Sequence, residues 1–163
     1  MFKKIVILVS LLLTPAIALT QGNIIHGPFN IDKNSRVYIK TENDINHPVG
    51  LYLERNNKSY KIDSYETNGN VPNIDTVFFI KLNQVKNIVI LASWHQKHRA
   101  EKINGDMYKI YGYSYKNHRL IPNKSITNDP KLQGQNGDFN GEYLHFKYKN
   151  AASIKEYLKD KFT

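Results

Sequence analysis

Two histidines in a short basic segment have a spacing that could bind a metal ion. His95 and His98 lie three positions apart in the segment 94–99, which reads WHQKHR. Imidazoles at this spacing could share a metal on one helical turn, but a third ligand would be needed and the neighbouring cations would repel the ion. Because Trp and Arg are over-represented at binding hot spots, we interpret Trp94, His95, His98 and Arg99 as a contact patch for a partner.

A second segment resembles the opening of a calcium-binding loop. Asn136, Asp138 and Asn140 place side-chain oxygens at positions 1, 3 and 5, and a glycine follows. Position 12 is Lys147, where such a loop needs a bidentate glutamate, and Glu142 could help only in an irregular loop. The alternatives are a weak Ca²⁺ site formed by Asn136, Asp138, Asn140 and Glu142, and a tight Asn-Gly turn before a last strand. We expect no metal and no other cofactor.

Tyrosine is abundant, with 11 residues in the chain, and several of them alternate with other residues in one segment. Tyr111 and Tyr113 lie between Lys109 and Lys116. Interleaved aromatic and basic residues could stack single-stranded bases, or could bind a protein, because tyrosine buries a large area at low entropic cost. Ordinary packing in the core and on the surface of a sheet is the third interpretation.

The common catalytic templates do not occur in this sequence. The chain contains no cysteine, which excludes thiol catalysis and thiolate metal sites. It also has no G-x-S-x-G, H-E-x-x-H, P-loop or G-x-G-x-x-G motif. Its carboxylates are scattered, and spacing alone does not pair any two of them as a glycosidase requires. We therefore predict a protein without enzymatic activity. The alternative is an exported hydrolase that uses these carboxylates with His95 or His98.

The elements that must position these residues centre on two apolar runs, 77–80 and 88–92. Both are rich in β-branched and aromatic residues and apolar without alternation, which is typical of strands buried on both faces. After the second run we expect a basic loop over residues 95–102 and a two-residue turn at Asn104-Gly105. A long inner strand should follow over residues 107–115, with a bulge or bend at Gly112.

Further short strands and one helix complete the expected fold. The pattern predicts strands at 36–40, 51–54, 59–65 and 142–148, a hairpin turn at Asn56-Asn57, and irregular segments at 19–34 and 128–141. After Asn150, a good N-cap, the residues Ile154, Leu158 and Phe162 form an apolar helical stripe. We predict a single α+β, mostly β domain over residues 19–163, with an antiparallel-rich sheet and a C-terminal amphipathic helix.

The first 18 residues have the features of a secretory signal peptide. Lys3 and Lys4 precede an apolar run at 5–13, and Ala16-Ile17-Ala18 is a small-residue cleavage site. The run is too short to span a bilayer comfortably, so we expect no stable membrane anchor and a periplasmic or secreted protein. The net charge of +9 either attracts an anionic partner or simply maintains solubility. An exported protein rarely meets nucleic acid, so Tyr111 and Tyr113 join the predicted protein contacts.

The order of motifs in the carboxyl-terminal half has a counterpart among known proteins. The motifs are DTVFFIKL from Asp75, KNIVILASW from Lys86, GDMYKIYGY from Gly105, NGDFNGE from Asn136 and FKYKNAASIKEYL from Phe146. This order resembles small exported immunity proteins of Gram-negative bacteria, which act against antibacterial effectors such as those of type VI secretion systems. The resemblance implies a periplasmic protein without activity of its own that binds a secreted toxin and blocks its active site. It carries over no functional residue. A ligand- or envelope-binding module is the remaining alternative.

Overall fold

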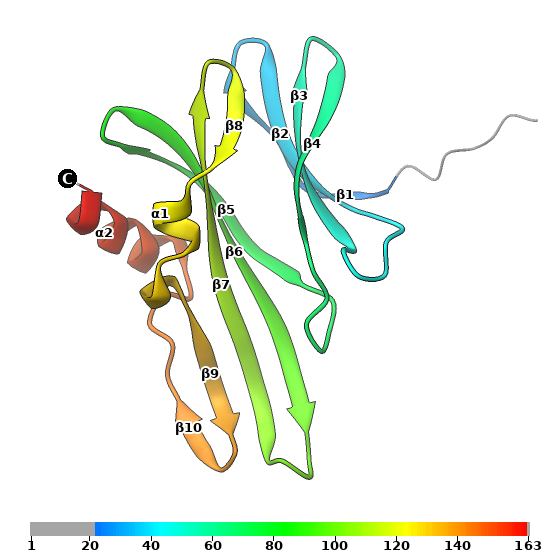
Figure 1. Ribbon diagram of the computed structural model, residues 1–163, viewed down its shortest axis with the longest axis vertical. Coiled ribbons are helices and arrows are strands. Elements are labelled where there is room, and N and C mark those ends of the chain that lie inside the picture. The colour runs from blue at the N-terminus through cyan, green and yellow to red at the C-terminus, as the bar shows by residue number, and fades with distance from the viewer. Residues whose placement is uncertain (1–21, 163) are drawn as a thin grey trace, which may run out of the picture.

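The computed structural model describes residues 22–162, which form two antiparallel sheets and a few short helices (Figure 1). The predicted signal peptide, residues 1–18, lies outside the described residues. The predicted α+β, mostly β class is confirmed. The strands are divided between two sheets that pack face to face, where the sequence pattern indicated a single sheet.

The first sheet is built from consecutive hairpins in the order β1-β2-β3-β4. Its strands are β1 (Ile24–Asp32), β2 (Ser35–Thr41), β3 (Val49–Arg55) and β4 (Lys58–Tyr65). Asn56 and Asn57 form the predicted turn, and their positive φ angles of 49° and 59° suit a two-residue hairpin. The expectation of an irregular segment is wrong for residues 24–32, which form β1, and residues 19–21 of the predicted segment lie outside the described residues. β1 is a largely exposed edge strand that contains Gly27-Pro28 and has an irregular register against β2, so its sequence carries little strand signal.

The second sheet has six strands in the order β10-β9-β7-β6-β5, and β8 pairs with the end of β7. Its strands are β5 (Asn73–Leu82), β6 (Val85–His98), β7 (Ile103–Lys116), β8 (Arg119–Pro122), β9 (Gln133–Phe139) and β10 (Glu142–Leu144). The two predicted core runs are confirmed as paired parts of β5 and β6. β6 and β7 contain 14 residues each and form the centre of the sheet.

The predicted loop at 95–102 and the predicted turn at Asn104-Gly105 are wrong. β6 continues to His98, and the chain reverses over residues 99–102, where Lys102 has a positive φ of 51°. Gly105 lies inside β7, where it is paired with Gln96 of β6 and Gly137 of β9. A Cβ added at Gly105 would lie 2.6 Å from the ring of Phe139. The glycine therefore serves packing and not the turn.

The predicted irregular segment at 128–141 contains β9, which pairs with the first half of β7. The actual turn is Asn140-Gly141, where both residues have positive φ angles of 55° and 86°. Gly134 lies under the ring of Phe146, so the glycine that suggests a loop makes room for an aromatic side chain. The predicted last strand is shorter than expected and ends at Leu144.

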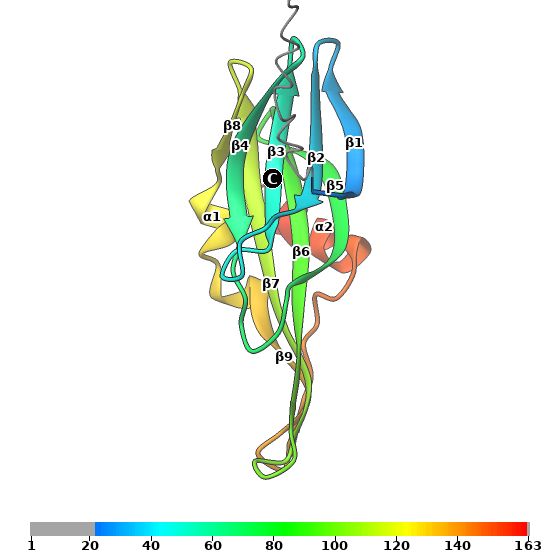
Figure 2. The same ribbon diagram turned by 90° about the vertical axis from the view of Figure 1, so that its right-hand side faces the viewer.

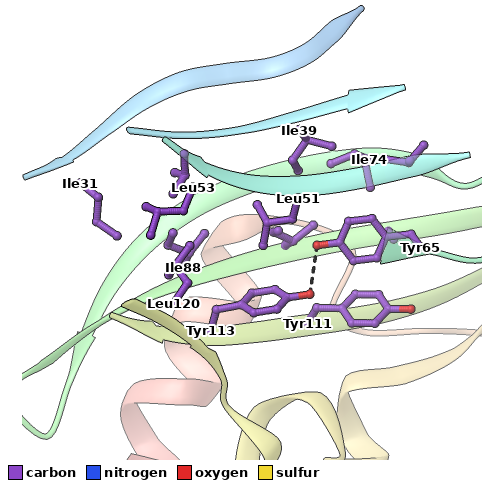
Figure 3. Packing of buried hydrophobic residues seen from close by; sticks show 14 of the residues in the cluster. Ile31, Ile39, Leu51, Leu53, Tyr65, Ile74, Ile88, Tyr111, Tyr113 and Leu120 are labelled. Atoms are coloured by element: carbon purple, nitrogen blue, oxygen red, sulfur yellow. Dashed lines mark hydrogen bonds between the residues drawn. The ribbon is translucent and has the colours of Figure 1, made fainter. Parts of the chain in front are cut away.

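The two sheets enclose the larger core (Figure 3). Side chains of both sheets interdigitate there, and the hydroxyls of Tyr65 and Tyr113 lie 3.1 Å apart across the interface. The fully buried residues of this layer include Ile39, Leu51, Tyr65, Ile88, Ile90 and Tyr113. Tyr113 also donates a hydrogen bond of 2.6 Å to Asp63 Oδ2, which satisfies its hydroxyl.

Three short helical segments cover the other face of the second sheet (Figure 1). They are α1 (Lys124–Thr127), a 3₁₀ helix (Pro130–Leu132) and α2 (Ala151–Phe162). The predicted C-terminal helix is confirmed, and Asn150 Oδ1 accepts a hydrogen bond of 2.9 Å from Ser153 N as its N-cap. Among residues 22–162, no helix is long and apolar enough to cross a membrane.

Gly112 does not mark the bulge or bend that the sequence suggested. The register of β6 against β7 is continuous past this residue. α1 packs directly on Gly112, where an added Cβ would lie 2.6 Å from Ile126 Cβ. The glycine therefore permits a close helix–sheet approach.

Candidate binding site

One half of the second sheet extends beyond the first sheet. Figures 1 and 2 show the far ends of β6, β7 and β9 reaching past the four-stranded sheet. Side chains alternate along each strand, so Trp94, Gln96 and His98 share one face of β6. Nearer the start of β6, this same face packs against the first sheet. This extension therefore presents a sheet face that the first sheet does not cover.

A groove of about 420 Å³ lies on this face, at the border of the first sheet. Trp94, Met107 and Tyr111 form the aromatic and apolar part of its lining, and Leu144 of β10 adds a fourth apolar side chain. The polar part of the lining consists of Glu66, Asn68, Lys109, Gln133 and Gln135. The groove is thus a mixed surface with large apolar residues next to amides, one cation and one carboxylate.

The segment that connects β4 to β5 forms one wall of the groove. Trp94 Nε1 donates a hydrogen bond of 2.9 Å to the backbone oxygen of Glu66, and Gln96 Nε2 donates one of 2.7 Å to that of Asn68. Trp94 is 4% exposed, so its indole anchors this wall and offers little surface to the groove. Side chains of β6 therefore fix the wall in place before any ligand binds.

Tyr111 lies between the core and the groove. It is 9% exposed and packs on Tyr65, with ring centroids 4.8 Å apart. Burial raises the pKa of the Tyr111 hydroxyl, and the nearby charges of Glu66 and Asp63 raise it further. Lys109 Nζ lies 5.1 Å from the Tyr111 ring centroid. The groove thus contains a neutral phenol beside an ammonium group.

The structure does not bring the six predicted contact residues onto one patch. Trp94 and Tyr111 line the groove, and His98 lies on the same face farther along β6. Tyr113 is 1% exposed between the sheets, so the prediction that it contacts a partner is wrong. His95 faces the opposite side, and Arg99 lies at the hairpin tip, where it borders a shallow depression with Lys97 and Lys102.

A polar cluster that the sequence did not reveal surrounds His95 on the opposite face. His95 Nδ1 lies 2.9 Å from Asp106 Oδ1, its cross-strand neighbour. Asp75 lies in an irregularity of β5 between Ile74 and Thr76. Burial raises the pKa of Asp75, and hydrogen bonds from Ser93 and Asn73 offset this only partly, while the charge of Asp106 adds to it.

Sequence spacing could not pair Asp75 with Asp106 because they are on different strands, and the irregular register redirects Asp75. Burial also raises the pKa of the neighbouring Tyr108, with the charges of Asp106 and Asp75 contributing. The groove lining does not contain Asp75, Asp106 or His95, although Tyr108 belongs to it.

The calcium candidates are distributed over two faces of the β9–β10 hairpin. Asn136 and Asp138 alternate with Phe139, whereas Glu142 is the cross-strand partner of Phe139. Asn136 Oδ1 also accepts a hydrogen bond of 2.7 Å from Lys149 Nζ, so an ammonium group lies beside this oxygen. Within the described part of the chain, no three or more His, Asp or Glu side chains form a group that could hold a metal ion.

No protein-family model, curated protein or solved structure matches this chain. The groove and the polar cluster are the two assemblies of side chains considered for the main function. The groove has a volume in the range of ligand sites and an aromatic lining. The polar cluster has hydrogen-bonded titratable groups.

Proposed function

We propose that this chain is an exported binding protein that neutralises a partner protein, in the manner of an immunity protein that blocks an antibacterial toxin in the periplasm. The observation that carries the proposal is the groove on the uncovered sheet face. It combines Trp94, Met107, Tyr111 and Leu144 with amides and a lysine. Aromatic residues and Met are enriched at interface centres and polar groups at their rims, so this composition suits a protein partner.

The charge of the chain favours a partner with an acidic surface. Lys109 lies in the groove, and Lys97, Arg99 and Lys102 surround the tip of the neighbouring hairpin. The whole chain has a net charge of +9. Positive potential accelerates encounter with an acidic cleft and orients the two proteins.

Because hydrogen bonds from Trp94 and Gln96 already hold the groove wall, little ordering is needed on binding. The bound chain would occlude the toxin's active site.

The test uses the product of the gene beside this one, directed to the periplasm of a sensitive host. We expect the full chain to form a stoichiometric complex with that product and to restore growth. Leu144→Asp and Lys109→Glu should weaken the complex about tenfold or more, because each introduces a carboxylate into the groove. Lys81→Glu makes the same charge change as Lys109→Glu at an exposed site on β5 and should keep full affinity. A neighbouring product that forms no complex, or equal losses in all three variants, contradicts the proposal.

A hydrolase acting on cell-envelope material is the second candidate, and the polar cluster favours it. A carboxyl with a raised pKa, Asp75, could donate a proton while the Asp106–His95 pair accepts one. A zymogram on cell-wall material separates the two functions. Clearing by the full chain that Asp75→Asn or Asp106→Asn abolishes, and Lys81→Glu preserves, would establish the enzyme and displace the binding function. No clearing by the full chain removes this candidate.

A further inference from the structure

The two long sides of the sheet sandwich differ in how they are closed. On the β1–β5 side, Phe29 packs edge-on against Phe79 with ring centroids 6.3 Å apart, and His26 Nε2 donates a hydrogen bond of 2.8 Å to the backbone oxygen of Ile74. On the β4–β8 side, a cleft of about 410 Å³ lies between the sheets. It is separate from the groove, with which it shares no lining residue.

The cleft has an apolar part and a cationic part. Leu53 of β3, Ile62 of β4 and Leu120 of β8 line it and continue into the core between the sheets. Arg55 and Arg119 lie at the hairpin ends of β3 and β8 and also line the cleft. The cleft is therefore complementary to a molecule with an apolar chain and an anionic end.

The two arginines of the cleft have no acidic partner among the described residues. No ion pair formed by residues 22–162 involves Arg55 or Arg119. His118, the third basic residue of the lining, lies 3.2 Å from Asp32 Oδ2, so this carboxylate is already engaged. Arg55 Nε is buried and is the one buried side-chain nitrogen or oxygen of the described residues without a hydrogen-bond partner. Such a group is costly in a folded protein unless a ligand or ion satisfies it.

The strand register adds an independent argument for an anion. Arg55 is paired across the β3–β4 hairpin with Lys58, and Arg119 is paired across the β7–β8 hairpin with Lys116. Like charges directly opposite each other on neighbouring strands are destabilising. Two such pairs at the ends of the two hairpins that border the cleft create a concentrated positive potential.

We propose that the β4–β8 cleft binds a small amphipathic anion, a carboxylate or phosphate carried on an apolar chain. Arg55 and Arg119 bind the anionic group, because guanidinium forks match carboxylate and phosphate geometry. The apolar chain lies against Leu53, Ile62 and Leu120. Tyr60, which is 51% exposed, also lines the cleft and would cover part of the ligand's apolar chain. This site goes beyond the proposed protein-binding function and does not depend on it.

Calorimetric titration of the full chain with octanoate, octanol and acetate tests both parts of the site. We expect one molecule of octanoate to bind per chain. Octanol lacks the anion and acetate lacks the apolar chain, so each should bind about tenfold more weakly or not at all. No binding of octanoate overturns the proposal. Equal binding of octanol or of acetate also overturns it, because one half of the cleft would then contribute nothing.

Three variants locate the binding at the cleft. Arg55→Met and Arg119→Gln should each weaken octanoate binding about tenfold. Arg36→Gln removes the same charge on the outer face of β2, where Arg36 pairs with Glu54, and should bind as the unmodified chain does. Arg55→Met should also raise the melting temperature of the free protein, because it removes the unsatisfied Nε. Unchanged affinity in Arg119→Gln, an exposed position where misfolding is not expected, overturns the proposal even if Arg55→Met fails to fold.

Co-sedimentation with vesicles distinguishes the two sources of such an anion. Binding to phosphatidylglycerol vesicles but not to phosphatidylcholine vesicles, with loss in Arg119→Gln, supports the site and identifies a membrane lipid as the source. Octanoate binding without vesicle binding supports the site and identifies a free acid as the source.

Discussion

Gly112 determines how closely α1 can approach the second sheet. Its amide donates a hydrogen bond of 3.0 Å to Thr127 Oγ1, and its carbonyl accepts one of 2.7 Å from Asn123 N. An added Cβ at this position would lie 2.6 to 2.8 Å from three carbon atoms of Ile126. Ile126 is fully buried, so it has no free space into which it could move.

Replacing Gly112 should therefore destabilise the protein in proportion to the volume added. We expect Gly112→Ala to lower the free energy of unfolding by about 1–3 kcal/mol through overpacking, and Gly112→Val to lower it further. Urea denaturation monitored by circular dichroism measures both values. A change below about 0.5 kcal/mol for alanine, which is typical of a surface position, would contradict the close contact.

The face of the sheet on which each β7 side chain lies could be predicted from sequence, but the extent of its burial could not. The predicted strand over residues 107–115 implies that Met107, Tyr111 and Tyr113 share one face, because side chains of a strand alternate with a period of two, and the structure has them there. What covers that face depends on Tyr65, which is 48 positions from Tyr113 in sequence. For this reason Tyr113, predicted as a partner contact, is a core residue.

At the scale of elements, the β6–β7 hairpin shows why turn signals can mislead. Asn104-Gly105 has the composition of a two-residue turn, but a glycine is needed at position 105 because the Phe139 ring packs against its backbone. The real reversal contains Lys102 at a φ of 51°, a left-handed conformation that is unfavourable for a residue with a Cβ. The hairpin thus extends farther than predicted and supports the uncovered half of the sheet.

Lys102→Gly should stabilise this hairpin. A left-handed conformation costs a residue with a Cβ about 1–2 kcal/mol, which glycine avoids, although glycine loses more backbone entropy on folding. We expect a net gain of up to about 1 kcal/mol in the free energy of unfolding, measured by urea denaturation. The control is Lys97→Gly, in the paired part of β6, which should lose about 0.5–1 kcal/mol. Equal losses in the two variants would show that Lys102 is not left-handed in solution.

For the whole molecule, the sequence predicts the class of the fold more readily than its topology. Short strands with turn signals and a terminal amphipathic stripe suffice for a mostly β, α+β class. The division into two sheets depends on contacts between distant segments, such as Tyr113 Oη to Asp63 and Lys86 Nζ to the backbone oxygen of Ile31. The same reason explains why neither the groove nor the β4–β8 cleft could be predicted. Both combine residues of strands that are far apart in sequence.

Asp32 joins the two sheets near the β1–β2 turn and should make their association sensitive to acid. It accepts a hydrogen bond from Tyr115 Oη of the second sheet and one of 2.8 Å from Asn34 N, and lies 3.2 Å from His118 Nδ1. The bond from Tyr115 contributes most to lowering the pKa of Asp32, burial opposes it, and the bonds from Asn34 and His118 lower it further. The net pKa is well below the usual range.

Because the folded-state pKa of Asp32 is lowered, its contribution to stability is complete above the unfolded pKa of about 3.9 and is lost as the pH falls below it. Asp32→Asn should therefore lower the free energy of unfolding at neutral pH by about 1–2 kcal/mol, a value reduced for the partial solvent exposure of the carboxylate. Urea denaturation between pH 7 and pH 2 should show the stability difference between the two proteins shrinking below about pH 3.9, because the unfolded state of the unmodified chain then binds a proton that the folded carboxylate does not. Asp138→Asn, at an exposed site of β9, serves as the control and should follow the unmodified chain. A stability difference that stays constant down to pH 2 would mean that the carboxylate charge does not hold the sheets together.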